Sequence, residues 1–315
     1  MGVPGAAAAQ SPISDILARI TGKNVRNVSV GTSLETGLGL SSLERVELMG
    51  ALEDRYRVDL SETSFTAAST VGDLEKLVRQ GATQAREFHY PRWTLRWPVT
   101  WVRLAAQYLL VMPAVFLLGS PRVEGRENLH GVRGPLLVIS NHIDDVDVGF
   151  IQMALPFHLR YKLATATGGE ALEIKRSPAA SQPWWLRICD RVQWTLGVAL
   201  LNLFPLPRES GFRKSFAYAG EAADRGFSIL VFPEGRHTED GKLRPFRSGI
   251  GLLAQNLQIP VLPMRIDGLF DVKRSGRKFA PSGKITVKIG KPVHVSVQDA
   301  AEKIARELEN EVERL

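Results

Sequence analysis

His142 and Asp147 are the residues of this chain whose types and spacing best suit acid–base chemistry. The apolar run before them, residues 136–140, predicts a buried strand, so the histidine would follow a strand end. An imidazole titrates near neutral pH, and a carboxylate beside it fixes the tautomer and stabilises the imidazolium. The His-x4-Asp spacing lets the two side chains meet across one loop or helical turn. A solvated turn or a helix cap can contain the same pair, so other parts of the chain must decide.

The whole chain has 315 residues, which suggests about two domains, and 44% of the residues are apolar, enough to bury a core. The single cysteine, Cys189, rules out an internal disulfide and fits a reducing compartment. No cluster of Cys and His suggests a metal site. Residues 1–9 lack the basic start and apolar centre of a signal peptide, and we expect a disordered leader there.

Charge is uneven along the chain. Residues 1–80 contain more acidic than basic residues, so the net charge of +7 comes entirely from the part that follows. A basic second part suggests that this part binds nucleic acid, an anionic membrane surface or an acidic partner. The basic residues are spread among Trp-rich apolar stretches, which suits a membrane and argues against nucleic acid.

The first domain, residues 10–85, is predicted to be a small all-α bundle. Residues 43–56 place apolar side chains at helical spacing with charges on the other face, and Ser41 or Ser42 would be the N-cap. Helices near residues 13–20 and 71–79 flank it, the last opened by Thr70 or Asp73.

Residues 38–48, Leu-Gly-Leu-Ser-Ser-Leu-Glu-Arg-Val-Glu-Leu, resemble the acyl carrier protein signature. The resemblance implies 4'-phosphopantetheine on Ser42, attached by a phosphopantetheinyl transferase. A phosphodiester at a helix N-terminus meets free N–H groups and the positive end of the dipole. Carrier proteins usually have Asp where this chain has Ser41, which leaves open that Ser42 only caps a docking bundle.

The connector, residues 86–120, has the features of a membrane-associated segment. An apolar run of 15 residues, 104–118, is short of the roughly 20 needed for a span. Tryptophans and arginines precede it, which suits a headgroup interface, and Pro98 could lie in the first turn of a helix. A full span would put the first domain and His142 on opposite sides of a membrane, so we expect a monotopic or re-entrant helix pair, with a buried core helix as the alternative. A second apolar stretch, 184–206, would lie on the same surface.

The second domain, residues 121–315, alternates short apolar strands with helical stretches, which predicts an α/β sheet covered by helices. Strands are expected at residues 136–140, 200–204, 228–232, 261–266 and 285–289, and helices near 212–224, 249–255 and 297–315.

Three further blocks follow the His-x4-Asp pair: Phe-Pro-Leu-Pro-Arg ending at Arg208, Phe-Pro-Glu-Gly-Arg-His around Glu234, and Val-Leu-Pro from residue 261. In this order they resemble the 1-acylglycerol-3-phosphate acyltransferase (PlsC-like) family over residues 100–295. The expected fold is therefore a PlsC-like α/β domain with membrane-associated helices, preceded by a carrier-type bundle.

The resemblance implies transfer of an acyl group from an acyl-CoA or acyl carrier protein thioester to a lipid hydroxyl. His142 would be the general base and Asp147 its partner, without a metal. Arg208, Glu234, Gly235 and Arg236 would bind the acceptor, although Arg208 could instead form a surface salt bridge and Glu234 could brace its loop.

One departure from the family concerns the acceptor: Arg236 and His237 stand where the family usually has Thr and Arg. A largely neutral histidine cannot replace the bidentate phosphate contact of an arginine. The acceptor is therefore either a lysophospholipid such as 1-acylglycerol-3-phosphate or a phosphate-free lipid or alcohol. The chain's own carrier domain would hold the donor thioester at the cytoplasmic face of a membrane. In a second possibility, this domain receives its acyl groups from a separate acyl-activating ligase. A non-catalytic lipid-binding scaffold is the remaining alternative.

Overall fold

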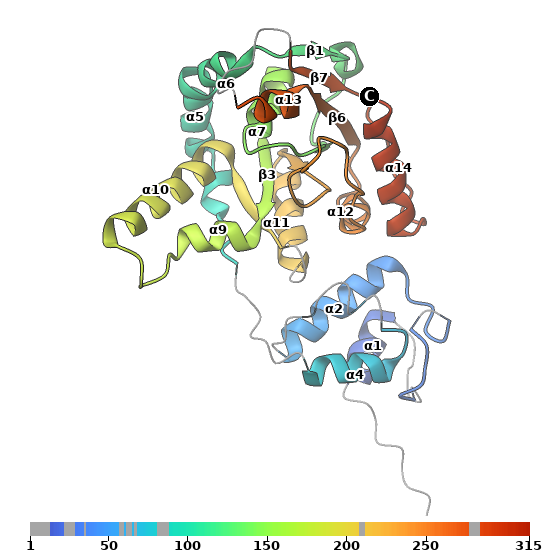
Figure 1. Ribbon diagram of the computed structural model, residues 1–315. Coiled ribbons are helices and arrows are strands. Elements are labelled where there is room, and N and C mark those ends of the chain that lie inside the picture. The colour runs from blue at the N-terminus through green and yellow to red at the C-terminus, as the bar shows by residue number, and fades with distance from the viewer. Residues whose placement is uncertain are drawn as a thin grey trace, which may run out of the picture. The chain divides into compact units, whose positions relative to one another are not determined.

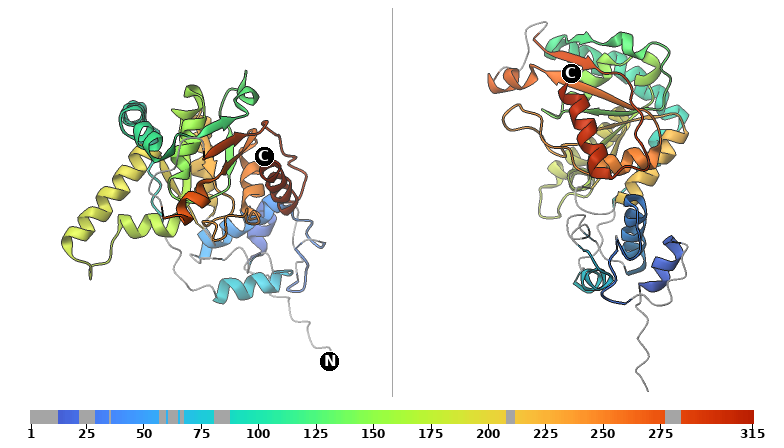
Figure 2. Two further views of the ribbon diagram at one scale, coloured as in Figure 1. Left: turned by 45° about the horizontal axis from the view of Figure 1, so that its top comes forward. Right: turned by 90° about the vertical axis from the view of Figure 1, so that its right-hand side faces the viewer.

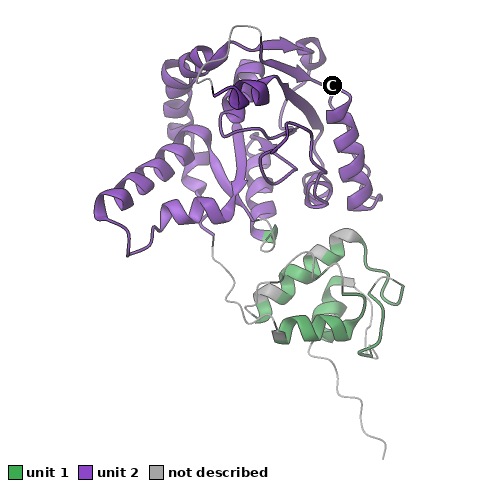
Figure 3. Ribbon diagram, viewed as in Figure 1, with its two compact units in different colours: residues 1–87, 209–213 green, residues 88–208, 214–315 purple. Residues whose placement is uncertain are grey.

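The computed structural model describes residues 13–21, 29–34, 36–56, 60, 65, 68–80, 88–207, 212–276 and 284–315. The chain forms two compact units, Met1–Glu87 with Glu209–Arg213, and Phe88–Arg208 with Lys214–Leu315 (Figures 1 and 3). The predicted leader, residues 1–9, and Arg208 lie outside the described residues. Most of the predicted connector, from Phe88 onward, is grouped with the second unit.

The first unit is helical, as predicted. Its described helices are α1 (Ser14–Thr21), α2 (Ser42–Tyr56) and α4 (Val71–Gln80), each within two residues of the expected bounds. The helices bury one apolar face each, with Leu17, Leu48, Leu52 and Leu74 fully inside. Apolar periodicity in the sequence is therefore enough to find this bundle.

Capping boxes begin two of these helices. The Ser41 N–H donates to Glu44 Oε2 at 2.7 Å, and the Glu44 N–H donates to Ser41 Oγ at 3.3 Å. Thr70 and Asp73 make the equivalent reciprocal pair before α4. Ser41, and not Ser42, is thus the cap of α2, and Ser42 is the first residue of the helix.

The second unit is built on a seven-stranded sheet in the order β1-β7-β6-β2-β5-β3-β4. All neighbouring strands are parallel except the antiparallel pair β6 and β7. The predicted α/β class is confirmed. The strands are β1 (Arg122–Glu124), β2 (Leu137–Ser140), β3 (Leu163–Gly168), β4 (Leu203–Leu206), β5 (Ser228–Val231), β6 (Val261–Asp267) and β7 (Thr286–Ile289).

Helices surround this sheet (Figure 2). Leu137 to Ser140 and Ser228 to Val231 are buried at every position, as expected for central parallel strands covered on both faces. The α-helices are α5 (Trp97–Ala106), α6 (Met112–Gly119), α7 (Asp147–Ala154), α8 (Phe157–Arg160), α9 (Gly169–Arg176), α10 (Trp184–Leu201), α11 (Phe212–Asp224), α12 (Gly249–Leu257), α13 (Leu269–Arg274) and α14 (Ala301–Glu313).

The strand predicted at residues 200–204 is wrong at its start. Residues 200 and 201 still belong to α10, and Asn202 ends that helix in the left-handed conformation with φ 53°. The strand β4 begins only at Leu203. A continuous apolar run does not reveal where a helix gives way to a strand, whereas an Asn in the left-handed region is a recognisable helix end.

The apolar part of the connector is one continuous helical run, Trp97–Gly119, in which a π-helical turn, Gln107–Val111, joins α5 to α6. Pro98 lies in its first turn, as predicted. By length and composition the 23 residues could cross a membrane. Arg103 is buried within the run and donates to Ala199 O at 2.8 Å and Thr94 O at 2.9 Å, which ties α5 to α10.

Candidate active site

His142 and Asp147 meet beyond the carboxyl end of β2. His142 follows the strand by two residues, and Asp147 is the first residue of α7. The imidazole Nδ1 lies 2.9 Å from Asp147 Oδ2. The His142 side chain is 18% exposed and that of Asp147 is fully buried, so a substrate can reach the imidazole but water does not reach its carboxylate partner. The crevice at the carboxyl ends of parallel strands is where α/β proteins usually bind ligands.

One oxygen of Asp147 collects the hydrogen bonds of the loop. Asp147 Oδ2 accepts from the Ile143 N–H at 2.6 Å and the Asp144 N–H at 3.0 Å, besides the His142 ring. Three donors on one oxygen suit an ionised carboxylate, which only accepts. The hydrogen of His142 then lies on Nδ1, which leaves Nε2 with a lone pair to take a proton.

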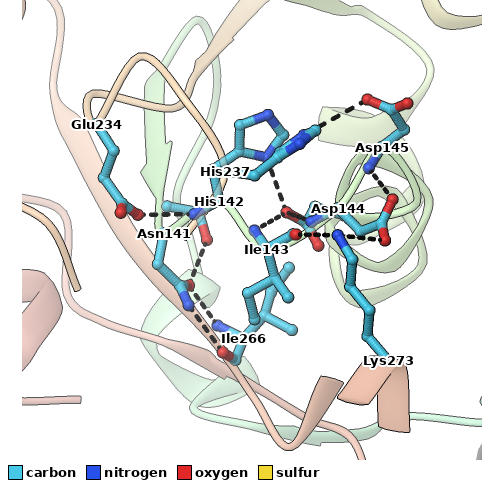
Figure 4. Close-up of polar contacts among 11 residues, drawn as sticks. Asn141, His142, Ile143, Asp144, Asp145, Glu234, His237, Ile266 and Lys273 are labelled. Atoms are coloured by element: carbon cyan, nitrogen blue, oxygen red, sulfur yellow. Dashed lines mark hydrogen bonds and ion pairs between the residues drawn. The ribbon is translucent and has the colours of Figure 1, made fainter. Parts of the chain in front are cut away.

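Two aromatic rings hold the imidazole of His142. Phe232 stacks on it with the ring centroids 4.2 Å apart, and His237 meets it edge to face at 4.0 Å. His237 Nε2 lies 3.5 Å from Asp145 Oδ1 (Figure 4). Burial lowers the pKa of His237, and the nearby charge of His142 lowers this pKa further. The residue that departs from the family pattern is therefore a neutral neighbour of the candidate base at pH 7.

Glu234 connects the loop after β5 to the loop after β2. Its Oε1 accepts the backbone N–H of His142 at 2.8 Å, and its Oε2 accepts that of Arg244 at 3.0 Å. The side chain is buried, and burial raises its pKa although the two backbone N–H groups oppose the shift. In this structure Glu234 braces two loops; its binding of the acceptor stays a prediction.

Asn141 and Lys273 also contact or belong to this loop, and neither is part of the sequence motifs. The Asn141 side chain pairs with both backbone groups of Ile266 in β6, at 2.9 and 2.8 Å (Figure 4). Its place directly before His142 was a usable signal, because Asn readily bonds backbone groups. Lys273 Nζ lies 2.9 Å from Asp144 Oδ2 and 3.1 Å from Ile143 O. No local pattern distinguishes this lysine, since its partners are about 130 residues away.

The other predicted site residues are less closely associated with the pair. Gly235 has φ +72°, and a Cβ there would lie 2.8 Å from Arg247 Nε, so the position favours glycine. Arg236 is exposed. Arg208 lies outside the described residues, and Ser42 belongs to the other unit. Their roles stay predictions. Within the described ranges, no group of three or more His, Cys, Asp or Glu could hold a metal ion.

Family models match both units. Residues 120–267 match the model described as acyltransferase, and residues 11–78 match the model described as phosphopantetheine attachment site. These matches agree with the two families that the sequence motifs resemble.

Curated relatives match the second unit. The 1-acyl-sn-glycerol-3-phosphate acyltransferase BAT2 of Brassica napus is 25% identical over 180 residues, 56% of this chain and 46% of that protein. The human 1-acyl-sn-glycerol-3-phosphate acyltransferase beta is 30% identical over 169 residues, 53% of this chain and 54% of that protein. The matched part thus spans about half the length of these relatives.

A similar solved structure is that of the 1-acyl-sn-glycerophosphate (LPA) acyltransferase PlsC from Thermotoga maritima. It is 23% identical with a TM-score of 0.45, over 69% of this chain and 81% of that one. The chain thus contains a PlsC-type acyltransferase domain at residues 120–267 and a phosphopantetheine attachment-site domain at residues 11–78.

Proposed function

We propose that the second unit transfers an acyl group from a thioester to the hydroxyl of a lipid acceptor, with His142 as general base. The observation that carries the proposal is the 2.9 Å contact between His142 Nδ1 and Asp147 Oδ2, which leaves Nε2 to act. The relatives' names, 1-acyl-sn-glycerol-3-phosphate acyltransferases, support an acyl transfer of this type.

The reaction needs one proton acceptor and no covalent acyl-enzyme, because the thioester is already activated. Nε2 of His142 takes the hydroxyl proton while the hydroxyl oxygen attacks the thioester carbonyl carbon. The tetrahedral intermediate then collapses, the carbon–sulfur bond breaks, and the imidazolium returns the proton to the leaving sulfur. Asp147 stabilises the imidazolium throughout, and the products are an ester and a thiol.

The test of this role compares wild type with His142→Ala in acyl transfer from a radiolabelled acyl thioester. We expect turnover to fall at least about a hundredfold, the usual contribution of a general base. His130→Ala is the matched control. His130 is exposed and lies before β2, outside the loop of His142, so this variant should keep full activity. Undiminished turnover in His142→Ala would refute His142 as the general base, whereas no turnover by the wild type would leave a non-catalytic lipid-binding scaffold.

Two classes of compound are candidates for the acyl acceptor, and one experiment distinguishes them. The relatives' names favour 1-acylglycerol-3-phosphate, whereas the neutral His237 beside the base favours an acceptor without phosphate at that point. Offering lysophosphatidate, a phosphate-free lysolipid and a long-chain alcohol in parallel ranks them by kcat/KM. Preference for lysophosphatidate supports the first candidate, and preference for a phosphate-free compound supports the second.

Ser42 is our proposed attachment site for 4'-phosphopantetheine. It is the first residue of α2, where a phosphodiester would lie at the positive end of the helix dipole, and the cap is supplied by its neighbour Ser41. When bound, the group supplies a thiol that can hold an acyl chain as a thioester. A phosphopantetheinyl transferase would load it and a separate acyl-activating ligase would acylate it. Intact mass after incubation with such a transferase should rise by one phosphopantetheine, and no rise would exclude the carrier role.

We further propose that the helical run Trp97–Gly119 and α10 bind the cytoplasmic face of a membrane without crossing it. Arg103 joins the two elements, and side chains more than half exposed cover both. Aromatic and aliphatic side chains of this kind bind the interface between headgroups and acyl chains. The exposed residues are Trp97, Trp101, Val102, Leu109, Leu110, Phe116, Leu117, Trp184, Trp185 and Ile188.

Sedimentation with anionic phospholipid vesicles tests this binding. Replacing Leu109, Phe116 and Leu117 by Ser should release the protein from the vesicles. Val297→Ser, at an exposed apolar residue near α14, should leave binding unchanged. Equal sedimentation of all three proteins would show that the helical run does not bind lipid.

A further inference from the structure

Lys273 touches the loop that carries the candidate base at two successive residues. It lies in α13, and its ammonium pairs with Asp144 Oδ2 at 2.9 Å and donates to the backbone carbonyl of Ile143 at 3.1 Å. Figure 4 shows the side chain extending from α13 toward both groups. An exposed ion pair by itself contributes little, so the backbone contact is the informative one.

The peptide bond between Ile143 and Asp144 is hydrogen-bonded at both ends. Its carbonyl accepts from Lys273, and its N–H, that of Asp144, donates to Asp147 Oδ2 at 3.0 Å. Because a peptide unit is planar and its C=O and N–H point in opposite directions, fixing the carbonyl also fixes the N–H. A rotation of this plane would break both bonds at once.

The same oxygen of Asp147 accepts from the His142 ring. A continuous series of hydrogen bonds therefore runs from Lys273 through one peptide plane to Asp147 Oδ2 and from there to His142 Nδ1. In a protein interior, bonds in such a series polarise and orient one another. The ammonium of Lys273 is the charged end of this series.

Asp144 shows that the lysine acts on this loop electrostatically. Burial by itself would raise the pKa of Asp144, but the hydrogen bond and charge of Lys273, with the backbone N–H of Asp145, lower the pKa overall. Asp144 therefore carries its negative charge opposite Lys273 at neutral pH.

We propose that Lys273 is a positioning residue of the acyl transfer, which holds the Ile143–Asp144 peptide and through it the carboxylate that orients His142. The proposal rests on the function proposed above. Lys273 does not touch the reacting atoms in this scheme, so its loss should lower kcat and leave KM nearly unchanged.

The experiment compares Lys273→Met, Lys273→Arg and Asp144→Asn with wild type. We expect Lys273→Met to lower kcat about tenfold, as for one lost orienting charge-assisted hydrogen bond, with KM within about twofold. Lys273→Arg, which keeps a donor and a charge, should recover activity to within about threefold of wild type. Asp144→Asn removes the ion pair but not the backbone bond, and its effect should be the smaller one.

Lys288→Met is the matched control. Lys288 lies on β7 and pairs with Asp267 at 3.0 Å, and its exposure of 32% resembles the 46% of Lys273. Lys288→Met therefore removes a comparable ion pair at the surface of the same unit. If Lys273→Met lowers kcat no more than Lys288→Met, the positioning role is refuted.

A readout independent of turnover is the NMR signal of the His142 Nδ1 proton, assigned by its loss in His142→Ala. In Lys273→Met this signal should shift or broaden, while Lys288→Met should leave it in place. An unchanged signal would overturn the inference even if kcat fell. If instead wild type transfers no acyl group, the proposed function fails, and the NMR comparison still decides whether Lys273 orders the pair.

Discussion

The carboxylate of Glu234 accepts the backbone N–H of His142 at 2.8 Å, although 92 residues separate them in the sequence. The contact exists because β2 and β5 are parallel neighbours and the loops after them leave the same edge of the sheet. It identifies Glu234 as a brace of the base loop.

Glu234→Gln should therefore destabilise the fold. One of its two side-chain ends becomes an NH2 group facing a backbone N–H, which leaves a buried donor unsatisfied at a cost of about 1–3 kcal/mol. Urea unfolding followed by circular dichroism measures the difference. If Glu234 only bound the acceptor, the variant would raise KM while its free energy of unfolding stayed at the wild-type value.

Asp147→Asn should abolish most of the turnover while the fold remains. An amide oxygen at the position of Oδ2 can still accept the hydrogen bonds of the loop, but a neutral amide no longer stabilises the imidazolium that forms when His142 takes a proton. We expect kcat to fall at least about a hundredfold. A loss of only a few-fold would mean that the negative charge of Asp147 contributes little to the acyl transfer.

Gly235→Ala should destabilise the loop for two separable reasons. The left-handed backbone costs an L residue about 1–2 kcal/mol, and the new Cβ would lie 2.8 Å from Arg247 Nε. Gly131→Ala shares the positive φ but meets no atom within 4 Å, so it measures the backbone cost alone. Thermal unfolding should show a larger loss for Gly235→Ala than for Gly131→Ala; equal losses would show that Arg247 moves aside.

His237→Phe should weaken the dependence of stability on pH. Burial lowers the pKa of His237 below its ordinary value of 6.5, so below that pH the unfolded chain binds more protons than the folded one. The contribution of His237 to stability is thus present above pH 6.5 and is lost as the pH falls. The melting temperature should drop less between pH 8 and pH 5.5 in His237→Phe than in wild type. Parallel drops would contradict a neutral His237.

Ser41→Ala should lower the stability of the first unit, whereas Ser42→Ala should prevent its modification. Ser41 caps α2, so its replacement should lower stability by about 0.5–2 kcal/mol and leave phosphopantetheinylation intact. Ser42→Ala should keep stability and prevent the mass increase. Loss of the modification in Ser41→Ala with normal stability would place the attachment at Ser41.

Local patterns in the sequence were sufficient to locate many helices, strands and motifs of this protein. Apolar periodicity located α2 and α4, and short apolar runs located β2, β5 and β6, because helices and central strands are recognised over a few residues. The spacing of His142 and Asp147 similarly allowed their contact, since both belong to one loop and its following helix.

Only the tertiary structure decided which distant residues complete the site. The sequence did not reveal that Glu234 would bond the backbone of His142, that His237 would lie on its ring, or that Lys273 would hold the Ile143 carbonyl. These contacts depend on the strand order β6-β2-β5, which brings three loops to one edge of the sheet. Strand order is set by the packing of the whole domain, so no local pattern encodes it.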